Sequence, residues 1–282
     1  MRKFALLGVA ALVAAGCAAF LAGLRKGSPV VVDTKAHAAT GGGNATASLD
    51  AVDHSTWDRL LRTYVDEDGM VDYAAWKASE ADRAALSEYL ATLSRANPTA
   101  QTSKAGKLAF WINAYNALTI HGILKEYPTS SIRNHTAKLV GYNIWDDLLL
   151  PVGDQDYSLN EIEHEILRKL GEPRIHFAIV CASVGCPRLL NRAYTPAKLE
   201  EQLAMNTRDF FSRDQNFQID VANRRVRVSA ILDWFGEDFG PSPRKGLAGL
   251  AQYLPGASTR QLVGSEDFAV TFLDYDWSLN EQ

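Results

Sequence analysis

The hydrophobic and polar positions divide the chain into an apolar start, a polar stretch without periodicity and a long patterned region. Residues 4–24 carry no charged side chain, and a helix of that length covers roughly 30 Å, the thickness of bilayer hydrocarbon. Residues 28–48 are rich in Gly, Ala, Thr and Ser. We expect a membrane anchor or export signal at 1–26, a flexible linker at 27–48 and one folded domain at 49–282.

The apolar segment has three fates that the sequence leaves open. The best small-residue cleavage site, Ala36-His37-Ala38, lies well beyond the apolar core, which favours an uncleaved anchor. Ala15-Gly16-Cys17 has the small residues of a lipoprotein processing site, although Ala14 stands where a large aliphatic residue is usual. We expect the membrane to be a partner through residues 4–24 and the domain to be membrane-anchored and periplasmic or extracytoplasmic, with a secreted or lipoprotein form as the alternative.

Helical periodicity dominates the first half of the patterned region. Apolar residues recur at helical spacing between Asp53 and Leu93, which predicts a helical N-terminal layer. The stretch from Lys104 to Glu126 is apolar on nearly every face, which is typical of a central, buried helix.

Shorter elements follow, and together with the central helix they set the fold class. Ser158 and Glu161 form the pattern of a capping box and start another helix. The remaining predictions are a buried strand over 175–180, an amphipathic helix over 194–211, a hairpin over 217–228, a short helix over 231–239 and a final strand over 268–277. We predict an α+β fold, mostly helical, with a small, largely antiparallel sheet packed around the buried central helix.

Charge and composition narrow the classes of partner. The net charge is −4 and the pI is about 5.9, and no basic stripe runs along any predicted element. Nucleic acid is therefore not an expected partner.

The cysteines of the folded region are Cys181 and Cys186, at the end of the predicted strand. Three interpretations stay open. The pair forms a disulfide outside the cytoplasm, Cys181 is a nucleophile supported by the imidazole of His176 or His164, or both are small buried residues without chemistry.

Polar residues embedded in apolar segments are the other candidates for a site. Asn113 and Asn116 lie one turn apart on the central helix and either bond to neighbouring backbone or line a pocket. Glu161, Glu163, His164 and Glu165 lack the spacing of a zinc-binding helix, so no metal site and no cofactor is expected. Metal-dependent hydrolysis, with His164, His176 and a glutamate as ligands assembled from separate elements, is the lowest-ranked alternative.

Five ordered segments resemble the family known as domain of unknown function 547. They are KLAFWINAYNALTIHGIL, SLNEIEHEILR, RIHFAIVCASVGCPRL followed by Tyr194-Thr195, ILDWFGEDFG and FLDYDWSLN. The resemblance implies no established reaction, substrate or cofactor. A kinship with papain- or transglutaminase-like folds is an analogy of architecture, and the buried helix that carries the cysteine in those enzymes carries Asn113 here.

Polar positions shared with this family define the predicted site, since such residues must converge on partners when the chain folds. The predicted catalytic residues are Cys181, His176, Glu163 and Asn113, and the predicted substrate-binding residues are Asn116, Tyr115, Tyr194 and Trp234. The expected function is a cysteine-dependent hydrolase or acyltransferase that acts on peptide or cell-envelope material. The alternative is a non-catalytic domain that binds a peptide or a cell-envelope glycan.

Overall fold

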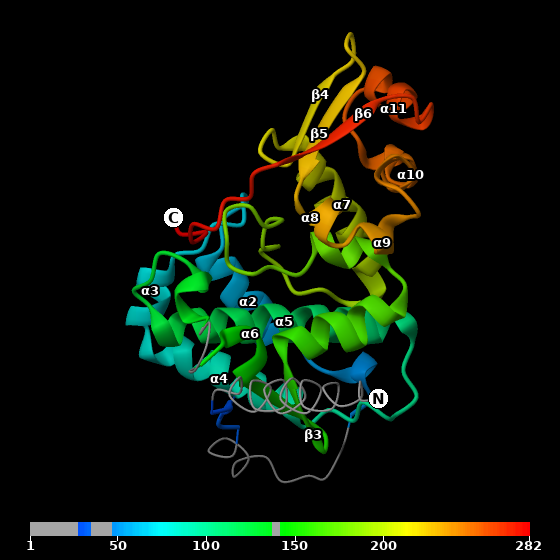
Figure 1. Cartoon of the computed structure of the whole chain (residues 1–282). Helices are drawn as coiled ribbons and strands as arrows, with labels where there is room; N and C mark the ends of the chain where they lie inside the picture. Colours follow the sequence, from blue (N-terminus) through cyan, green and yellow to red (C-terminus); the bar gives the residue numbers. More distant parts are fainter. Residues whose placement is uncertain (1–27, 35–46, 137–141) are drawn as a thin grey trace, which may run out of the picture.

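A computed structural model describes residues 28–34, 47–136 and 142–282 (Figure 1). It confirms the α+β class, with 53% of the described residues helical and two small sheets among them. The predicted anchor at 4–24 lies outside the described residues. Among the helices within those three ranges, none combines the length and the hydropathy needed to cross a bilayer.

The N-terminal layer is helical, as the periodicity predicts. It consists of α2 (Ser55–Tyr64), α3 (Tyr73–Ala78) and α4 (Glu80–Ser94). The rings of Trp57 and Tyr89 stack at 5.8 Å, and Tyr64 stacks on Trp76 at 4.7 Å. These stacked aromatic side chains are almost fully buried, so they bind the three helices into one layer.

The central helix is α5 (Lys104–Glu126), and 17 of its 23 residues are buried. The side chain of Ser103 caps it by accepting the backbone N–H of Gly106 at 2.9 Å. The helix ends at Glu126, with Tyr127 as the C-cap before Pro128, a residue that would have no N–H to continue the helix. The prediction of a buried helix with these bounds is confirmed.

Two three-stranded sheets replace the single, largely antiparallel sheet that the sequence suggests. One has the order β1 (Val30–Val31), β2 (Leu148–Val152), β3 (Gln155–Ser158), and the other β4 (Phe217–Asp220), β5 (Arg225–Ser229), β6 (Ala269–Leu273). Each contains one antiparallel hairpin, and the third strand joins from a distant segment and runs parallel. The hairpin predicted over 217–228 and the final strand are present. β1 falls within the predicted linker.

The strand predicted over 175–180 is wrong. Pro173 begins the 3₁₀ helix η6 (Pro173–Phe177), and the chain then runs on to Cys181 without a partner strand in the described parts of the chain. The side chain of Asn116 takes the place of that partner: it donates to the carbonyl of Ala178 and accepts the N–H of Val180, both at 3.0 Å. All residues from 175 to 180 are buried, and a fully buried segment has no polar face from which sequence could tell a strand from another form.

The remaining elements surround α5 and the second sheet. These elements are η2 (Leu49–Ala51), η3 (Ile132–His135), α6 (Ile144–Asp147), η4 (Glu161–Leu167), η5 (Arg168–Leu170), η7 (Pro196–Lys198), α7 (Leu199–Ser212), α8 (Ile231–Trp234), α9 (Gly236–Phe239), α10 (Pro243–Gly249), η8 (Ala251–Tyr253) and α11 (Ala257–Gly264).

The predicted capping box is confirmed ahead of η4, which is a π-helix. The backbone N–H of Ser158 donates to the Glu161 carboxylate at 2.8 Å, and the backbone N–H of Glu161 donates to the Ser158 hydroxyl at 3.2 Å.

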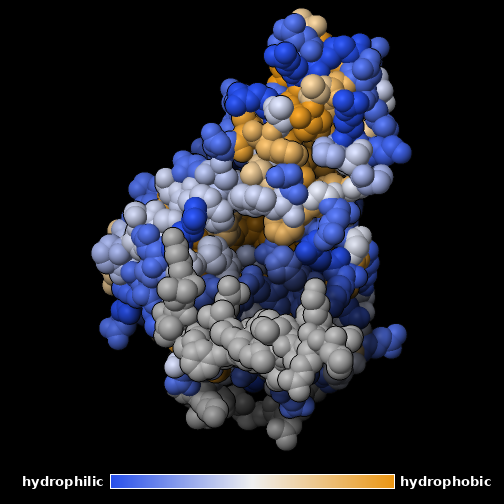
Figure 2. Space-filling view, viewed as in Figure 1, coloured by the Kyte–Doolittle hydropathy of each residue, from blue (hydrophilic) through white to orange (hydrophobic). Residues whose placement is uncertain are grey.

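The buried side chains form two hydrophobic clusters that correspond to the two ends of the molecule in Figure 1. The larger surrounds α5, and the smaller lies between α7, the sheet β4–β5–β6 and α10 and α11. Figure 2 shows a hollow in the surface where the two ends meet, with hydrophobic residues visible inside it.

We predict that Asn116→Ala destabilises the fold strongly, because it leaves the buried carbonyl of Ala178 and the buried N–H of Val180 without partners. Each such group costs about 1–3 kcal/mol. Urea unfolding measures the effect. Asn134→Ala is the control, since its amide is exposed and should change stability by less than about 0.5 kcal/mol. Equal effects of the two variants would contradict the role given to Asn116.

Candidate functional site

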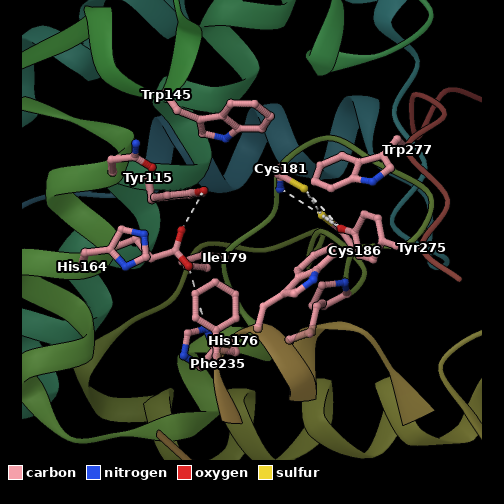
Figure 3. A pocket seen from close by; sticks show the side chains of 15 residues that line it. Tyr115, Trp145, His164, His176, Ile179, Cys181, Cys186, Phe235, Tyr275 and Trp277 are labelled. Atoms are coloured by element: carbon pink, nitrogen blue, oxygen red, sulfur yellow. Dashed lines mark hydrogen bonds and ion pairs between the residues drawn. The ribbon is translucent and has the colours of Figure 1, made fainter. Parts of the chain in front are cut away.

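A cavity of about 190 Å³ lies between α5, η4, α8 and the segment that follows η6 (Figure 3). Six of its fifteen lining residues are aromatic, while polar side chains and two sulfur atoms face it from different sides. The aromatic residues are Tyr115, Trp145, Trp234, Phe235, Tyr275 and Trp277; the polar residues and cysteines are Asn160, Glu163, His164, His176, Cys181 and Cys186.

The loop between the two cysteines is fixed by backbone contacts. Ala182 adopts a left-handed conformation with φ of 57°, which costs a residue with a Cβ roughly 1 kcal/mol. The C-terminal segment holds the loop in this shape: Val184 N–H donates to the carbonyl of Ser278, and Gly185 N–H to that of Asp276, both at 2.8 Å. A Cβ at Gly185 would lie 2.9 Å from the Asp276 backbone, so this approach requires glycine.

The strained loop brings the two thiols together. Cys181 and Cys186 are both free, and their Sγ atoms are 2.7 Å apart. The hydroxyl of Tyr275, from the C-terminal segment, donates to Cys186 Sγ at 3.0 Å and lies 3.3 Å from Cys181 Sγ. The backbone N–H of Cys181 also donates to Cys186 Sγ at 3.0 Å.

These donors distinguish the two sulfurs. Burial on its own raises the pKa of the Cys186 thiol, but the hydrogen bonds from Cys181 and Tyr275 outweigh it and lower the pKa overall. The pKa of the Cys181 thiol is raised well above its usual range, first by its hydrogen bond to Cys186 and then by burial. Cys186 is therefore the sulfur that the structure favours as thiolate, with Cys181 as the thiol that donates to it.

Glu163 lines the cavity from η4. Its residue is 8% exposed, and burial, with the nearby Cys181, raises the pKa of its carboxyl to about 7. The hydroxyl of Tyr115 donates to Oε2 at 3.3 Å, which works in the opposite direction. Such a carboxyl exchanges a proton near neutral pH, as an acid–base group must.

His176 lies beside Glu163 and is held in a neutral form. Its Nε2 is 2.7 Å from Asp238 Oδ2, and its Nδ1 is 3.9 Å from Glu163 Oε1. Burial lowers the pKa of the imidazole to about 4, although Asp238 acts to raise it. In the neutral ring Nε2–H donates to Asp238, which leaves the lone pair of Nδ1 on the side of Glu163.

Arg168 holds Asp238 in place. Its guanidinium donates to the two carboxylate oxygens of Asp238 at 2.6 and 2.9 Å and also contacts Glu237 and His164. Burial alone would raise the pKa of Asp238, but the bonds from Arg168 and His176 lower it. Phe235 stacks on the His176 ring at 4.1 Å and completes this support.

The predicted Cys–His contact is not formed. Within the described parts of the chain, neither ring nitrogen of His176 or His164 has a hydrogen bond to a sulfur atom: Asp238 and Glu163 face the nitrogens of His176, and Arg168 occupies Nδ1 of His164. Tyr275 and the backbone of Cys181 stand in the place of an imidazole beside the sulfur.

The structure brings some predicted residues together and places others elsewhere. Cys181, His176, Glu163, Tyr115 and Trp234 line the cavity. The other three, Asn113, Asn116 and Tyr194, are buried outside its lining: Asn113 exchanges hydrogen bonds of 2.8 and 2.9 Å with the backbone of Tyr194, Asn116 bonds to the segment 178–180, and the Tyr194 hydroxyl accepts from Asn206 at 3.0 Å.

Several residues of the site are absent from the predicted set. They are Tyr275 and Trp277 in the C-terminal segment, Trp145 on α6, Asn160, and Asp238 behind His176. A signal existed for some of them, because Asp238 and the DYDW run both fall in segments that resemble the family. Their distance from Cys181 in the sequence gave no reason to place them beside it.

No group of three or more metal-ligating side chains with a suitable arrangement occurs among residues 28–34, 47–136 and 142–282.

Comparison with known proteins identifies one family. Residues 99–211 match the family model described as "Protein of unknown function, DUF547", which confirms the resemblance. The match includes α5, η4 and the cysteine loop, whereas Trp234, Asp238 and Tyr275 lie beyond it. No curated protein and no solved structure matches the chain, so an architecture like papain or transglutaminase stays a prediction.

We predict that Glu163→Gln changes how stability depends on pH. A carboxyl whose pKa rises from 4.5 to about 7 on folding stabilises the fold relatively at low pH, and that contribution is lost as the pH rises from about 4.5 through 7. The glutamine variant has no such loss, so its stability relative to the unsubstituted protein should increase by roughly 3 kcal/mol across this window.

Urea unfolding at several pH values between 4.5 and 8 measures that difference. Glu201→Gln, at an exposed position on α7, is the control and should follow the unsubstituted protein throughout. A constant difference between Glu163→Gln and the unsubstituted protein across the window would show that Glu163 titrates at its ordinary pKa.

Proposed function

We propose that this chain, which belongs to the DUF547 family, is a membrane-tethered extracytoplasmic enzyme of the cysteine-dependent hydrolase or acyltransferase class. The observation that carries the proposal is a buried, titratable carboxyl and a hydrogen-bonded thiol pair facing one apolar cavity. Acyl transfer needs a sulfur nucleophile and a group that exchanges protons near neutral pH.

The thiolate is the attacking group. Cys186 Sγ receives hydrogen bonds from the Cys181 N–H and the Tyr275 hydroxyl, and a lowered pKa increases the thiolate fraction of Cys186 without a histidine base. In the acylation step the sulfur forms a bond to the carbonyl carbon, and the bond from that carbon to the leaving group breaks. This assignment moves the nucleophile from Cys181, the residue expected from sequence, to its neighbour.

Glu163 supplies proton transfer. Its protonated carboxyl can protonate an amine or alkoxide leaving group, and its ionised form can accept a proton from the water that releases the acyl group. Neutral His176 presents Nδ1 toward Glu163 Oε1 at 3.9 Å, and Asp238 and Arg168 fix the ring. His176 is thus a positioning residue beside the Glu163 carboxyl.

The aromatic wall limits the substrate to one with an apolar or ring-shaped group. Trp234 is 48% exposed and stacks on Trp277 at 5.7 Å, which places two indole faces at the edge of the cavity. Such faces bind apolar side chains and the C–H faces of sugars. Peptide or cell-envelope material, expected outside the cytoplasm, offers both. The same wall supports the second candidate function, a non-catalytic domain that holds a peptide or glycan.

We predict that the reduced protein becomes acetylated on Cys186 when it is mixed with p-nitrophenyl acetate at neutral pH, with release of p-nitrophenolate. Peptide mapping by mass spectrometry locates the acetyl group. Cys186→Ser should reduce the rate at least about tenfold, because a serine hydroxyl is not ionised at this pH. Cys17→Ser is the matched control and should keep the full rate.

Glu163→Gln separates the two half-reactions. Nitrophenolate leaves without a proton, so acetylation should keep its rate while hydrolysis of the acetyl-enzyme slows by at least about tenfold. Acetylation of Cys181 instead of Cys186 would show that Cys181, the residue expected from sequence, is the nucleophile. Failure of both thiols to react would favour the binding domain.

The membrane tether has its own test. We predict that the full chain, produced in a bacterial host, stays in the membrane pellet after an alkaline carbonate wash and is digested by protease added to spheroplasts. A variant without residues 1–26 should remain in the cytoplasm, because the apolar segment 4–24 is removed. A full chain found in the cytoplasmic fraction would overturn the proposed location.

A further inference from the structure

The thiol pair has a second chemistry that acyl transfer does not use. The Sγ atoms of Cys181 and Cys186 are 2.7 Å apart, whereas a single nucleophile needs no second thiol in contact. The pair lies on the wall of a cavity open to a ligand, and Cys181 is partly exposed. Two thiols in such a position can also react with each other.

The fold holds the sulfurs together rather than leaving them to meet by chance. The left-handed residue Ala182 turns the chain after Cys181, and the C-terminal segment fixes the loop through Val184 and Gly185. Asn280 N–H adds a third bond, to the carbonyl of Ala182 at 3.2 Å. The cost of closing the loop is therefore already met in the reduced fold.

The hydrogen bonds give the two sulfurs different roles. Cys186 Sγ accepts from the Cys181 N–H and from Tyr275, so it is the sulfur best stabilised as an anion. Cys181 keeps its proton and is the more exposed of the two. One sulfur is thus prepared to attack, and the other is in contact with it and able to attack second.

We propose that Cys181 and Cys186 form a dithiol–disulfide couple that exchanges with disulfide-bearing peptides or small molecules, with Cys186 as the attacking and Cys181 as the resolving sulfur. The Cys186 thiolate forms a bond to one sulfur of R–S–S–R′, and R′–S⁻ leaves with the electron pair. Cys181 gives its proton to that thiolate and then bonds to Cys186 Sγ, which expels R–S⁻. The pair loses two electrons and the substrate disulfide gains them.

This activity goes beyond the proposed acyl transfer, although it uses the same sulfurs. The oxidised couple has no thiolate, so acyl transfer would require the reduced form. Each activity can fail without the other, because disulfide exchange needs both cysteines whereas acylation needs one.

Equilibration of the full-length protein with mixtures of reduced and oxidised glutathione tests the couple. After acid quenching and alkylation, peptide mapping should show the Cys181–Cys186 disulfide replacing the two thiols as the mixture becomes more oxidising, with no lasting glutathione adduct. Thiols that persist in fully oxidised glutathione would overturn the proposal. This measurement requires no variant, so a folding defect cannot confuse it.

Two single variants test the roles of the sulfurs. Cys181→Ser should collect a stable glutathione adduct on Cys186, because the resolving sulfur is gone. Cys186→Ser should react at Cys181 at least about tenfold more slowly, since burial still raises the pKa of that thiol and no backbone N–H like the one bound to Cys186 donates to it in the described residues. Equal rates for the two variants, or a faster Cys181, would overturn the assigned order of attack.

Tyr275→Phe removes the hydroxyl that donates to Cys186 and should slow the first attack several-fold. Tyr142→Phe is its matched control, because the Tyr142 hydroxyl has no hydrogen-bond partner among residues 28–34, 47–136 and 142–282. The p-nitrophenyl acetate reaction, run on the same reduced samples, keeps the two activities apart. Acetylation without disulfide formation defeats only the redox couple, and disulfide formation without acetylation defeats only acyl transfer.

Discussion

The two hydrogen bonds that hold the backbone of residues 178–180 are the constraint on which the rest of the site depends. Asn116 extends from the buried face of α5 and bonds to a carbonyl and an N–H of this segment. One turn earlier, Asn113 does the same for the backbone of Tyr194. Because both amides are almost fully buried, no water can replace them. The cysteine loop between these two points therefore has fixed ends.

Because the ends of the loop are fixed, Ala182 keeps a strained backbone conformation between the two cysteines. Ala182 could relax from its left-handed conformation if either end of the loop were free. Asn116 on one side and the backbone of Asp276 and Ser278 on the other prevent it. The contact of the two sulfurs is a result of this arrangement, and the hydroxyl of Tyr275 reaches the pair because the C-terminal segment that holds the loop also carries that residue.

Burial in the cavity shifts the pKa values of the titratable groups and so decides which of them carry a charge. It keeps Glu163 protonated up to about neutral pH and His176 neutral, while Asp238 keeps its charge because Arg168 binds both of its oxygens. The pKa of Cys186 is lowered for a similar reason, since the Cys181 N–H and the Tyr275 hydroxyl donate to its sulfur. Water exclusion raises the energy of every charge, so a buried group keeps its charge only where its hydrogen-bond donors outweigh the effect of burial.

The sequence predicts the elements whose pattern is local and fails where a contact is distant. The period of α5, the capping box of Ser158 and the hairpin before α8 are properties of neighbouring residues, and all three are confirmed. The segment after Pro173 is read wrongly because its partner is a side chain about 60 positions earlier. Glu163 and His176 lie only 13 residues apart, yet their meeting depends on Asp238, Arg168 and Phe235 holding the ring. The sequence indicates which residues could be nucleophiles, but the fold decides which sulfur receives hydrogen bonds. These donors favour Cys186 over Cys181 as the nucleophile.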